Sequence, residues 1–151
     1  MMPRIRRDDP WRGTTQPPAA TVAVRYSQTI KISHLMTGLT LHSHAHDYGH
    51  SRSSGQQQVT CFRRADDDDL WKVKGPHGTQ ANHRSNEPVQ HGDDIRLEHV
   101  LTQRNLHSHS GHPSPVTGQQ EVTCFGSGGQ GDSNDNWRVE VEGGGQWNGQ
   151  R

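Results

Sequence analysis

The sequence predicts an all-β fold built from two copies of one unit. Two blocks of residues recur in the same order: residues 30–44 are repeated at 95–109, and residues 55–62 are repeated at 118–125. Matches of this length and order indicate an internal duplication, which has to be settled before any other interpretation. Within each copy, short alternating segments are separated by glycine, asparagine, serine and aspartate, and no segment keeps helical spacing over three turns.

Each copy is expected to contain four short strands. The candidates alternate apolar with polar or charged residues, as the strands of a half-buried sheet do. About four short strands per copy, with turn residues between them, are typical of a sandwich or barrel. The candidate strands are residues 30–32, 39–41, 58–62 and 71–73 in the first copy, and 95–97, 105–106, 121–125 and 137–139 in the second.

Three repeated motifs carry a resemblance to a known family. They are Leu-His-Ser-His at 41–44 and 106–109, Gly-Gln-Gln-x-Val-Thr beginning at Gly55 and Gly118, and the turn ending in Trp137. Together they resemble the MIR domain, a module shared by protein O-mannosyltransferases, stromal-cell-derived-factor-type proteins, and inositol-trisphosphate and ryanodine receptors. The resemblance implies a β-trefoil-like fold, in which three four-stranded units surround a pseudo-threefold axis.

The resemblance also predicts how the chain is divided. We expect two complete four-stranded repeats and the start of a third, so that the chain is a fragment or a truncated product of a three-repeat module. A barrel left open exposes unpaired strand edges, which favour self-association. The predicted parts are a flexible leader without signal-peptide character at 1–25 and an incomplete MIR-like domain at 26–151, with repeat one at about 26–75, a linker at 76–91, repeat two at about 92–141 and the start of repeat three at 146–151.

Composition narrows the classes of partner. The formal net charge is zero with neutral histidine, so no bulk electrostatic attraction to nucleic acid or anionic membrane is expected. No stretch approaches the ~20 apolar residues needed to cross a bilayer, which predicts no direct membrane insertion. Residues 1–25 lack the apolar run of a secretory signal. The compartment is therefore not encoded in a visible signal, although the resemblance implies the lumen of the endoplasmic reticulum.

Twelve histidines suggest an alternative function, a histidine-rich metal-binding or pH-responsive protein. His42, His44 and His46 alternate along a candidate strand, so their rings could share one face and bind a metal ion. No cysteine or carboxylate lies at zinc-finger spacing beside them, and we predict no metal or other cofactor. The acidic run Asp66–Asp69 could suggest calcium, but the motif favours a solvated turn before the last strand.

The function predicted first is a non-catalytic module that binds a glycan or an extended polypeptide. No nucleophile elbow, phosphate-binding glycine loop or paired-carboxylate motif is present, and the membrane part that an O-mannosyltransferase needs for catalysis is absent. Side-chain amides both donate and accept hydrogen bonds, which suits sugar hydroxyls or peptide backbone. The sequence also predicts free, partly buried thiols at Cys61 and Cys124. The candidate ligand-binding residues are His42, His44, Tyr48, Gln56, Gln57, His107, His109, Gln119 and Gln120.

Overall fold

The structure, a computed structural model, describes residues 20–49, 52–63 and 66–150, and it confirms the all-β prediction. Most of the predicted leader lies outside these residues. Each copy contains four strands, as expected. They are β2 (Thr29–Ile30), β3 (Thr40–Asp47), β4 (Gln57–Phe62) and β5 (Trp71–Lys74) in the first copy, and β6 (Asp94–His99), β7 (Arg104–His107), β8 (Thr123–Phe125) and β9 (Trp137–Arg138) in the second.

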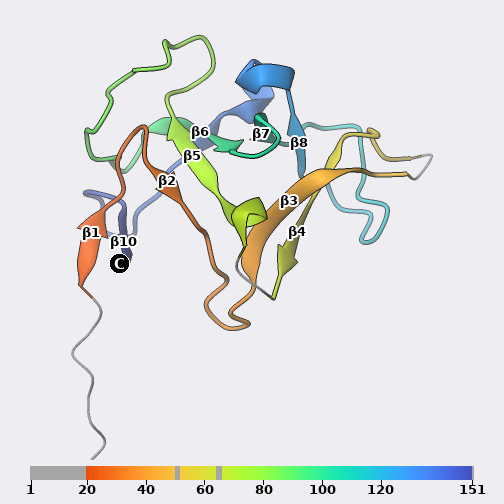
Figure 1. Cartoon of the computed structure of the whole chain (residues 1–151), viewed down its shortest axis with the longest axis horizontal. Helices are drawn as coiled ribbons and strands as arrows, with labels where there is room; N and C mark the ends of the chain where they lie inside the picture. Colours follow the sequence, from red (N-terminus) through yellow and green to blue (C-terminus); the bar gives the residue numbers. More distant parts are fainter. Residues whose placement is uncertain (1–19, 50–51, 64–65, 151) are drawn as a thin grey trace, which may run out of the picture.

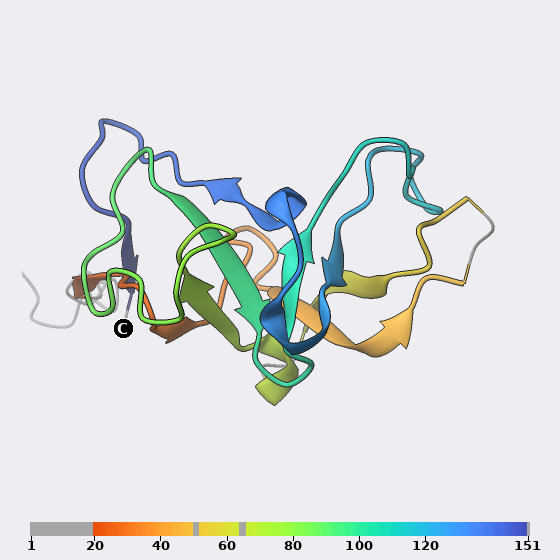
Figure 2. The same ribbon diagram turned by 90° about the horizontal axis from the view of Figure 1, so that it is seen from above.

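The two copies share one antiparallel sheet with the order β2-β5-β6-β7-β8-β4-β3, and β9 pairs separately with β6 (Figure 1). Strand β6 therefore joins the copies, because it pairs with β5 of the first and with β7 of its own copy. A second small sheet pairs β1 (Thr21–Ala23) with β10 (Asn148–Gln150). Figure 2 shows β6 crossing the middle of the molecule, with the β1–β10 end on one side and the long loops after β3 and β7 on the other.

The hydrophobic core lies between the copies and is small, as the low apolar content predicts. Trp71 is fully buried, and the indole of its counterpart Trp137 packs against the core while staying half-buried. Both indoles donate their Nε1–H to a backbone carbonyl, of Leu41 at 3.1 Å and of Leu106 at 2.9 Å respectively. The buried apolar residues are Val24, Tyr26, Trp71, Val73, Val89, Ile95, Leu97, Leu106 and Cys124.

The two cysteines are free, as predicted, but they occupy different environments. Cys61 is exposed, whereas Cys124 is buried in the core. Burial raises the pKa of the Cys124 thiol to about 12, because a thiolate is disfavoured away from water. The expectation that both thiols are partly buried is therefore wrong for Cys61, whose strand β4 turns this face toward solvent.

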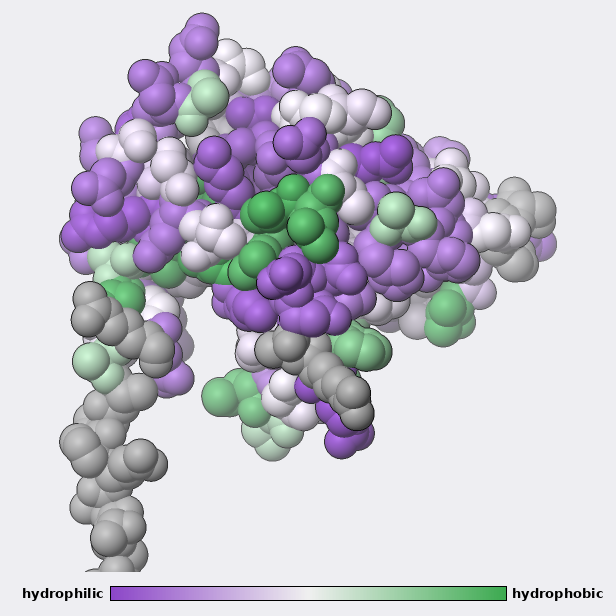
Figure 3. All heavy atoms as spheres, in the orientation of Figure 1, coloured by the Kyte–Doolittle hydropathy of each residue, from purple (hydrophilic) through white to green (hydrophobic). Residues whose placement is uncertain are grey.

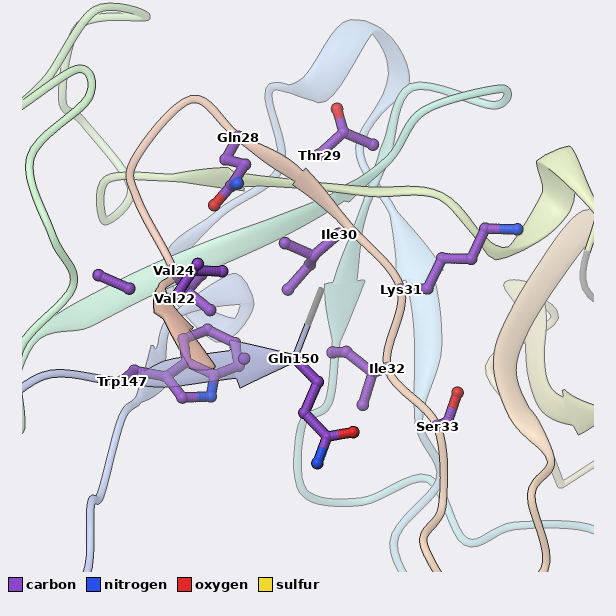
Figure 4. A pocket seen from close by; sticks show the side chains of 12 residues that line it. Val22, Val24, Gln28, Thr29, Ile30, Lys31, Ile32, Ser33, Trp147 and Gln150 are labelled. Atoms are coloured by element: carbon purple, nitrogen blue, oxygen red, sulfur yellow. The ribbon is translucent and has the colours of Figure 1, made fainter. Parts of the chain in front are cut away.

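A groove lined by both apolar and polar side chains separates the β1–β10 pair from β2 (Figure 4). Its volume is about 400 Å³, and Val24, Ile30 and Trp147 lie along it. The residues that the sequence assigned to the start of a third repeat include β10, which forms one wall of this groove by pairing with β1.

Candidate functional site

Each copy holds one histidine against a buried aspartate at equivalent positions. Nδ1 of His42 lies 2.8 Å from Oδ1 of Asp69, and Nδ1 of His107 lies 2.7 Å from Oδ1 of Asp135. Both carboxylates are completely buried, and both histidines are nearly so. Buried polar groups are stable when they are hydrogen-bonded to one another. The first histidine of each Leu-His-Ser-His motif is therefore a structural residue, held inside its unit.

The acidic residues before each tryptophan form a capped turn. Asp66 begins the short 3-10 helix η1 (Asp67–Asp69), and its carboxylate accepts the backbone N–H of Asp68 at 3.0 Å. The carboxylate of Asp69 in turn accepts the backbone N–H of Asp66 at 3.0 Å. The turn prediction is confirmed, but complete solvation was wrong, because Asp69 faces the interior and anchors His42. The second copy repeats the arrangement in η3 (Ser133–Asp135).

Beyond each buried histidine, aromatic rings continue to the surface in a row. We name the row of Phe62, His42, His44 and His46 the first histidine strip, and the row of Phe125, His107, His109 and His112 the second. Within the first strip, neighbouring ring centroids lie 4.9–5.8 Å apart. Within the second they lie 4.6–4.9 Å apart. Each strip therefore includes a buried histidine and extends from it to more accessible rings, on both sides of His42 in the first strip.

The proposed metal ligands do not converge as a group. The rings of His44 and His46 stack at 18°, with their centroids 5.8 Å apart. Among the described residues, the groups of three metal-ligating side chains within 4.8 Å are instead His42 with Asp66 and Asp69, and the matching set in the second copy. Hydrogen bonds within the capped turn already use these groups. Metal binding by the histidines stays a prediction without a preformed site.

The predicted glutamine ligands divide into inward-facing and outward-facing residues. Gln57 is buried, and its Nε2 donates to Oγ of Ser43 at 2.7 Å and to Oγ1 of Thr102 at 2.9 Å. Gln119 and Gln120 are exposed. Nε2 of Gln120 nevertheless donates to Oγ of Ser108 at 2.6 Å, as Gln57 does to Ser43, so internal hydrogen bonds use both of these equivalent amides.

Two further candidates lie between strands. Oε1 of Gln56 accepts the hydroxyl hydrogen of Thr123 at 2.6 Å. The hydroxyl of Tyr48 points at the carbonyls of Val59 and Val122, at 3.4 and 3.3 Å. Burial raises the pKa of Tyr48, so its hydroxyl remains a neutral donor. These contacts tie β4 to β8 and leave Gln56 and Tyr48 only partly available to a ligand.

The exposed ends of the histidine strips form the candidate site. The members that reach solvent are His44, His46 and Phe62 in the first copy, and in the second copy Phe125, His109 and His112 are half-buried. Phe62 is 43% exposed, and its role was missed because a phenylalanine on a strand is expected in the core. The neighbouring Cys61 is exposed as well, so the strand does not alternate between buried and exposed residues here. The exposure of Phe62 could therefore not be predicted from sequence alternation. Figure 3 shows one mostly hydrophilic face of the molecule with scattered apolar areas.

His99 supplies a pH-dependent contribution to stability. It is fully buried, with Nε2 2.8 Å from the carbonyl oxygen of Asp68 and Nδ1 2.7 Å from Oγ1 of Thr102. Desolvation by burial lowers its pKa, although the Asp68 carbonyl opposes this. The unfolded chain therefore binds a proton more readily, so the free energy of unfolding falls as the pH drops below the ordinary histidine pKa of about 6.5.

We expect His99→Gln to remove this part of the pH dependence. Urea unfolding between about pH 7 and 5 should show a shallower loss of stability in the variant than in the unchanged protein. His34 occupies the equivalent position in the first copy but is exposed, so His34→Gln should keep the original slope. If the free energy of unfolding depended on pH equally in His99→Gln and in the unchanged protein, His99 would not be the source of this pH dependence.

Comparison with known proteins identifies the family. The sequence profile of the MIR domain matches residues 65–146, which is more than half of the chain. The chain belongs to the MIR domain family. The MIR resemblance seen in the motifs and the β-trefoil-like fold class expected from it are both confirmed.

The relatives of this MIR chain include two groups. A stromal cell-derived factor 2-like protein of Dictyostelium discoideum is 48% identical over 82% of this chain and 58% of its own length. Protein O-mannosyl-transferase 2 of Drosophila pseudoobscura pseudoobscura is 43% identical over 80% of this chain but only 16% of its own length. The chain thus spans less than two thirds of each of these relatives.

A solved structure supports the same assignment. The crystal structure of the SDF2-like protein from Arabidopsis thaliana superposes with a TM-score of 0.73 at 40% identity, covering 83% of this MIR chain and 68% of that protein. None of the described helical segments has the length and apolar character required to span a membrane.

Proposed function

We propose that this MIR chain is a non-catalytic module that binds glycans at the exposed ends of its histidine strips. The observation that carries the proposal is the repeated row of rings, which begins at a buried histidine–aspartate pair and ends at solvent in both copies. The buried pairs hold the inner rings in fixed positions, so the outer rings lie on a rigid support. Preorganised groups bind with a smaller loss of conformational entropy.

The chemistry of the exposed groups suits a sugar. Imidazole and phenyl faces offer flat apolar surface to the C–H side of a pyranose ring. Amides such as those of Gln119 and Gln120 donate to and accept from hydroxyl groups. The carboxylates of Asp66 and Asp132, which are 46% and 47% exposed, lie 3.7 and 3.8 Å from Nδ1 of His42 and His107. Each copy therefore combines ring faces, an acceptor and nearby donors.

Two considerations favour binding over catalysis. The histidine–aspartate pairs and the capped turns that hold them have the same partners in both copies, whereas a reaction centre assigns different roles to different residues. The match to an O-mannosyl-transferase is limited to 16% of that enzyme. We infer that the module accompanies protein O-mannosylation or chaperone complexes in the lumen of the endoplasmic reticulum, as its relatives' family suggests.

Extended polypeptide is the second candidate ligand. Strand β3 ends the order of the large sheet, and its register with β4 shifts between Ser43 and Asp47. Exposed strand edges accept an added strand through main-chain hydrogen bonds. A peptide paired with residues 44–47 of β3 would pass beside His44 and His46. We propose that the self-association of this chain also occurs through this exposed edge of β3.

A glycan and unfolded-peptide array tests the proposal, followed by titration calorimetry of the best ligand. We expect a glycan to bind, and the double variant His44→Ala with Phe62→Ala to weaken that binding about tenfold, equivalent to about 1.4 kcal/mol. That loss is in the range for removing stacking contacts from two exposed rings.

His34→Ala is the matched control, because His34 is also an exposed histidine of the first copy but lies outside both strips. It should bind the glycan as tightly as the unchanged protein. Binding of unfolded peptides alone would favour the second candidate. Equal affinity of the double variant and the control would remove the histidine strips from the site.

A further inference from the structure

A basic cavity lies on the side of β5 and β6 that faces away from the core. In the pairing of these strands, Lys72 lies opposite Glu98 and Lys74 lies opposite Arg96. Their neighbours in sequence, such as Val73, point into the core, so these four side chains share the other face. The loop after β5 and residues 128–130 cover this face. The enclosed volume is about 380 Å³, and we name it the basic cavity, lined chiefly by Lys72, Lys74, His77, Arg96, Glu98 and Gly129.

Arg96 is the central residue of the basic cavity. It is only 7% exposed, and its Nε donates to the carbonyl oxygen of Gly75 at 2.7 Å. Within the described part of the chain, its two amino groups donate to no further acceptor. A guanidinium has five N–H donors in a planar fork and stays charged at neutral pH. Among the described residues, the buried side-chain atoms without a partner are Asn105 Oδ1 and Glu121 Oε2 and do not include these amino groups, so the amino groups are accessible to an anion in the cavity.

The charge in the basic cavity is not balanced by its own carboxylate. Nζ of Lys74 donates to Oε2 of Glu98 at 2.6 Å and to the carbonyl oxygen of Gly129 at 3.1 Å. This pair neutralises one cation and leaves Lys72 and Arg96 as the other cations of the lining, apart from His77. The buried carboxylate of Asp135 interacts with both Arg96 and Lys74, so the local excess is about one positive charge. The chain as a whole has a formal net charge of zero. The excess is therefore local, and it attracts anions to this place.

Glycine at position 129 makes the wall of the basic cavity possible. A Cβ added to Gly129 would lie 2.2 Å from Oε2 of Glu98 and 2.9 Å from Nζ of Lys74. Its φ of +74° also favours glycine over other residues. The backbone consequently approaches the Lys74–Glu98 pair closely and holds it in place.

The first copy does not repeat this arrangement. Lys31 occupies the position equivalent to Arg96, but it is exposed, and its Nζ donates to the carbonyl oxygen of Asp66 at 3.0 Å. The duplicated network of the histidines explains the frame that both units share. The shared histidine network does not require Arg96 to differ from Lys31. The difference therefore favours a separate role for Arg96 in the second unit.

We propose that the basic cavity binds a small oxyanion, a phosphate or carboxylate group carried by a low-molecular-weight ligand. Arginine recognises such groups through two parallel N–H···O hydrogen bonds, and a lysine adds a point charge. The volume lies at the lower end of the range for small-molecule pockets. Arg96 supplies the fork and Lys72 the second charge, while the Lys74–Glu98 pair and Gly129 shape the wall. This site is independent of the histidine strips.

Titration of the full chain at constant ionic strength tests the proposal. The probes are inorganic phosphate, acetate, and glucose 6-phosphate with glucose as the uncharged control, followed by backbone amide NMR up to about 20 mM, well above a millimolar Kd. We expect saturable shifts at residues 96 and 128–130 with at least one anion and none with glucose. Tighter binding of phosphate than of acetate identifies a phosphate site, and the reverse order identifies a carboxylate site.

Three variants make the result specific. Arg96→Met keeps the length of the side chain without its charge and should weaken binding at least tenfold. Lys72→Met, at a less buried position, should weaken it several-fold and guards against a folding defect in the first variant. Lys31→Met is the matched control and should have no effect. Absence of saturable shifts at these residues, or equal losses in the Lys31 and Lys72 variants, would overturn the proposal.

Discussion

Replacing Asp135 with alanine is expected to lower the free energy of unfolding by about 3–5 kcal/mol. Its buried carboxylate accepts hydrogen bonds from Nδ1 of His107 at 2.7 Å, Nδ2 of Asn105 at 3.0 Å and the backbone N–H of Asp132 at 2.9 Å. The substitution removes this acceptor from His107 and from the backbone N–H of Asp132, at about 1–3 kcal/mol for each unsatisfied group. Asn105 keeps its hydrogen bond to the carbonyl oxygen of Gly129 at 3.1 Å. Because small domains have only about 5–15 kcal/mol of stability, the variant should be near its unfolding threshold.

Urea unfolding followed by tryptophan fluorescence measures this loss. Asp132→Ala is the matched control in the same turn, since that carboxylate is half-exposed, caps backbone N–H groups of the turn such as that of Asn134 at 2.8 Å, and lies 3.8 Å from Nδ1 of His107. Loss of such a cap costs about 1 kcal/mol. If the two variants were equally stable, Asp135 would not be the anchor of the second unit.

Trp71→Ala is expected to cost about 3–5 kcal/mol, because it removes the largest fully buried side chain of the core and leaves a cavity. The substitution also removes the donor to the Leu41 carbonyl, which joins β5 to β3. The unfolding midpoint in urea should shift strongly, while Trp71→Phe should recover most of the loss because it restores apolar volume.

The second copy provides the matched control for this prediction. Trp137 makes the equivalent hydrogen bond to Leu106 but is only half-buried. Trp137→Ala should therefore cost clearly less than Trp71→Ala, since less apolar surface is lost from contact. Equal losses in the free energy of unfolding for the two variants would contradict the difference in burial between Trp71 and Trp137.

The duplication allowed much of the fold to be predicted, because repeated residues make repeated contacts. The strand candidates, the turns before Trp71 and Trp137, and the all-β class all follow from local alternation and turn residues. Sequence spacing also shows that His34 and His99 are equivalent, yet one is exposed and the other fully buried. Burial depends on what packs over each copy, and that is a tertiary property.

The site was harder to predict for the same reason. Asp69 and Asp135 belong to acidic segments that are expected in solvent, and only the three-dimensional partners show that each anchors a histidine. Arg96 alternates with apolar residues and was therefore expected on a solvated face. The glycine-rich loop that covers it is 31–35 residues further along the chain, at residues 127–131, so no local pattern links the two.

Histidine-ring NMR with the best glycan from the array tests the central claim most directly. If the ligand meets the outer rings of the histidine strips, the ring resonances of His44 and His109 should shift on titration. Those of His42 and His107, which are held by buried aspartates, should move much less. Shifts confined to His34, His77 or His91, with the strip rings unchanged, would contradict the account.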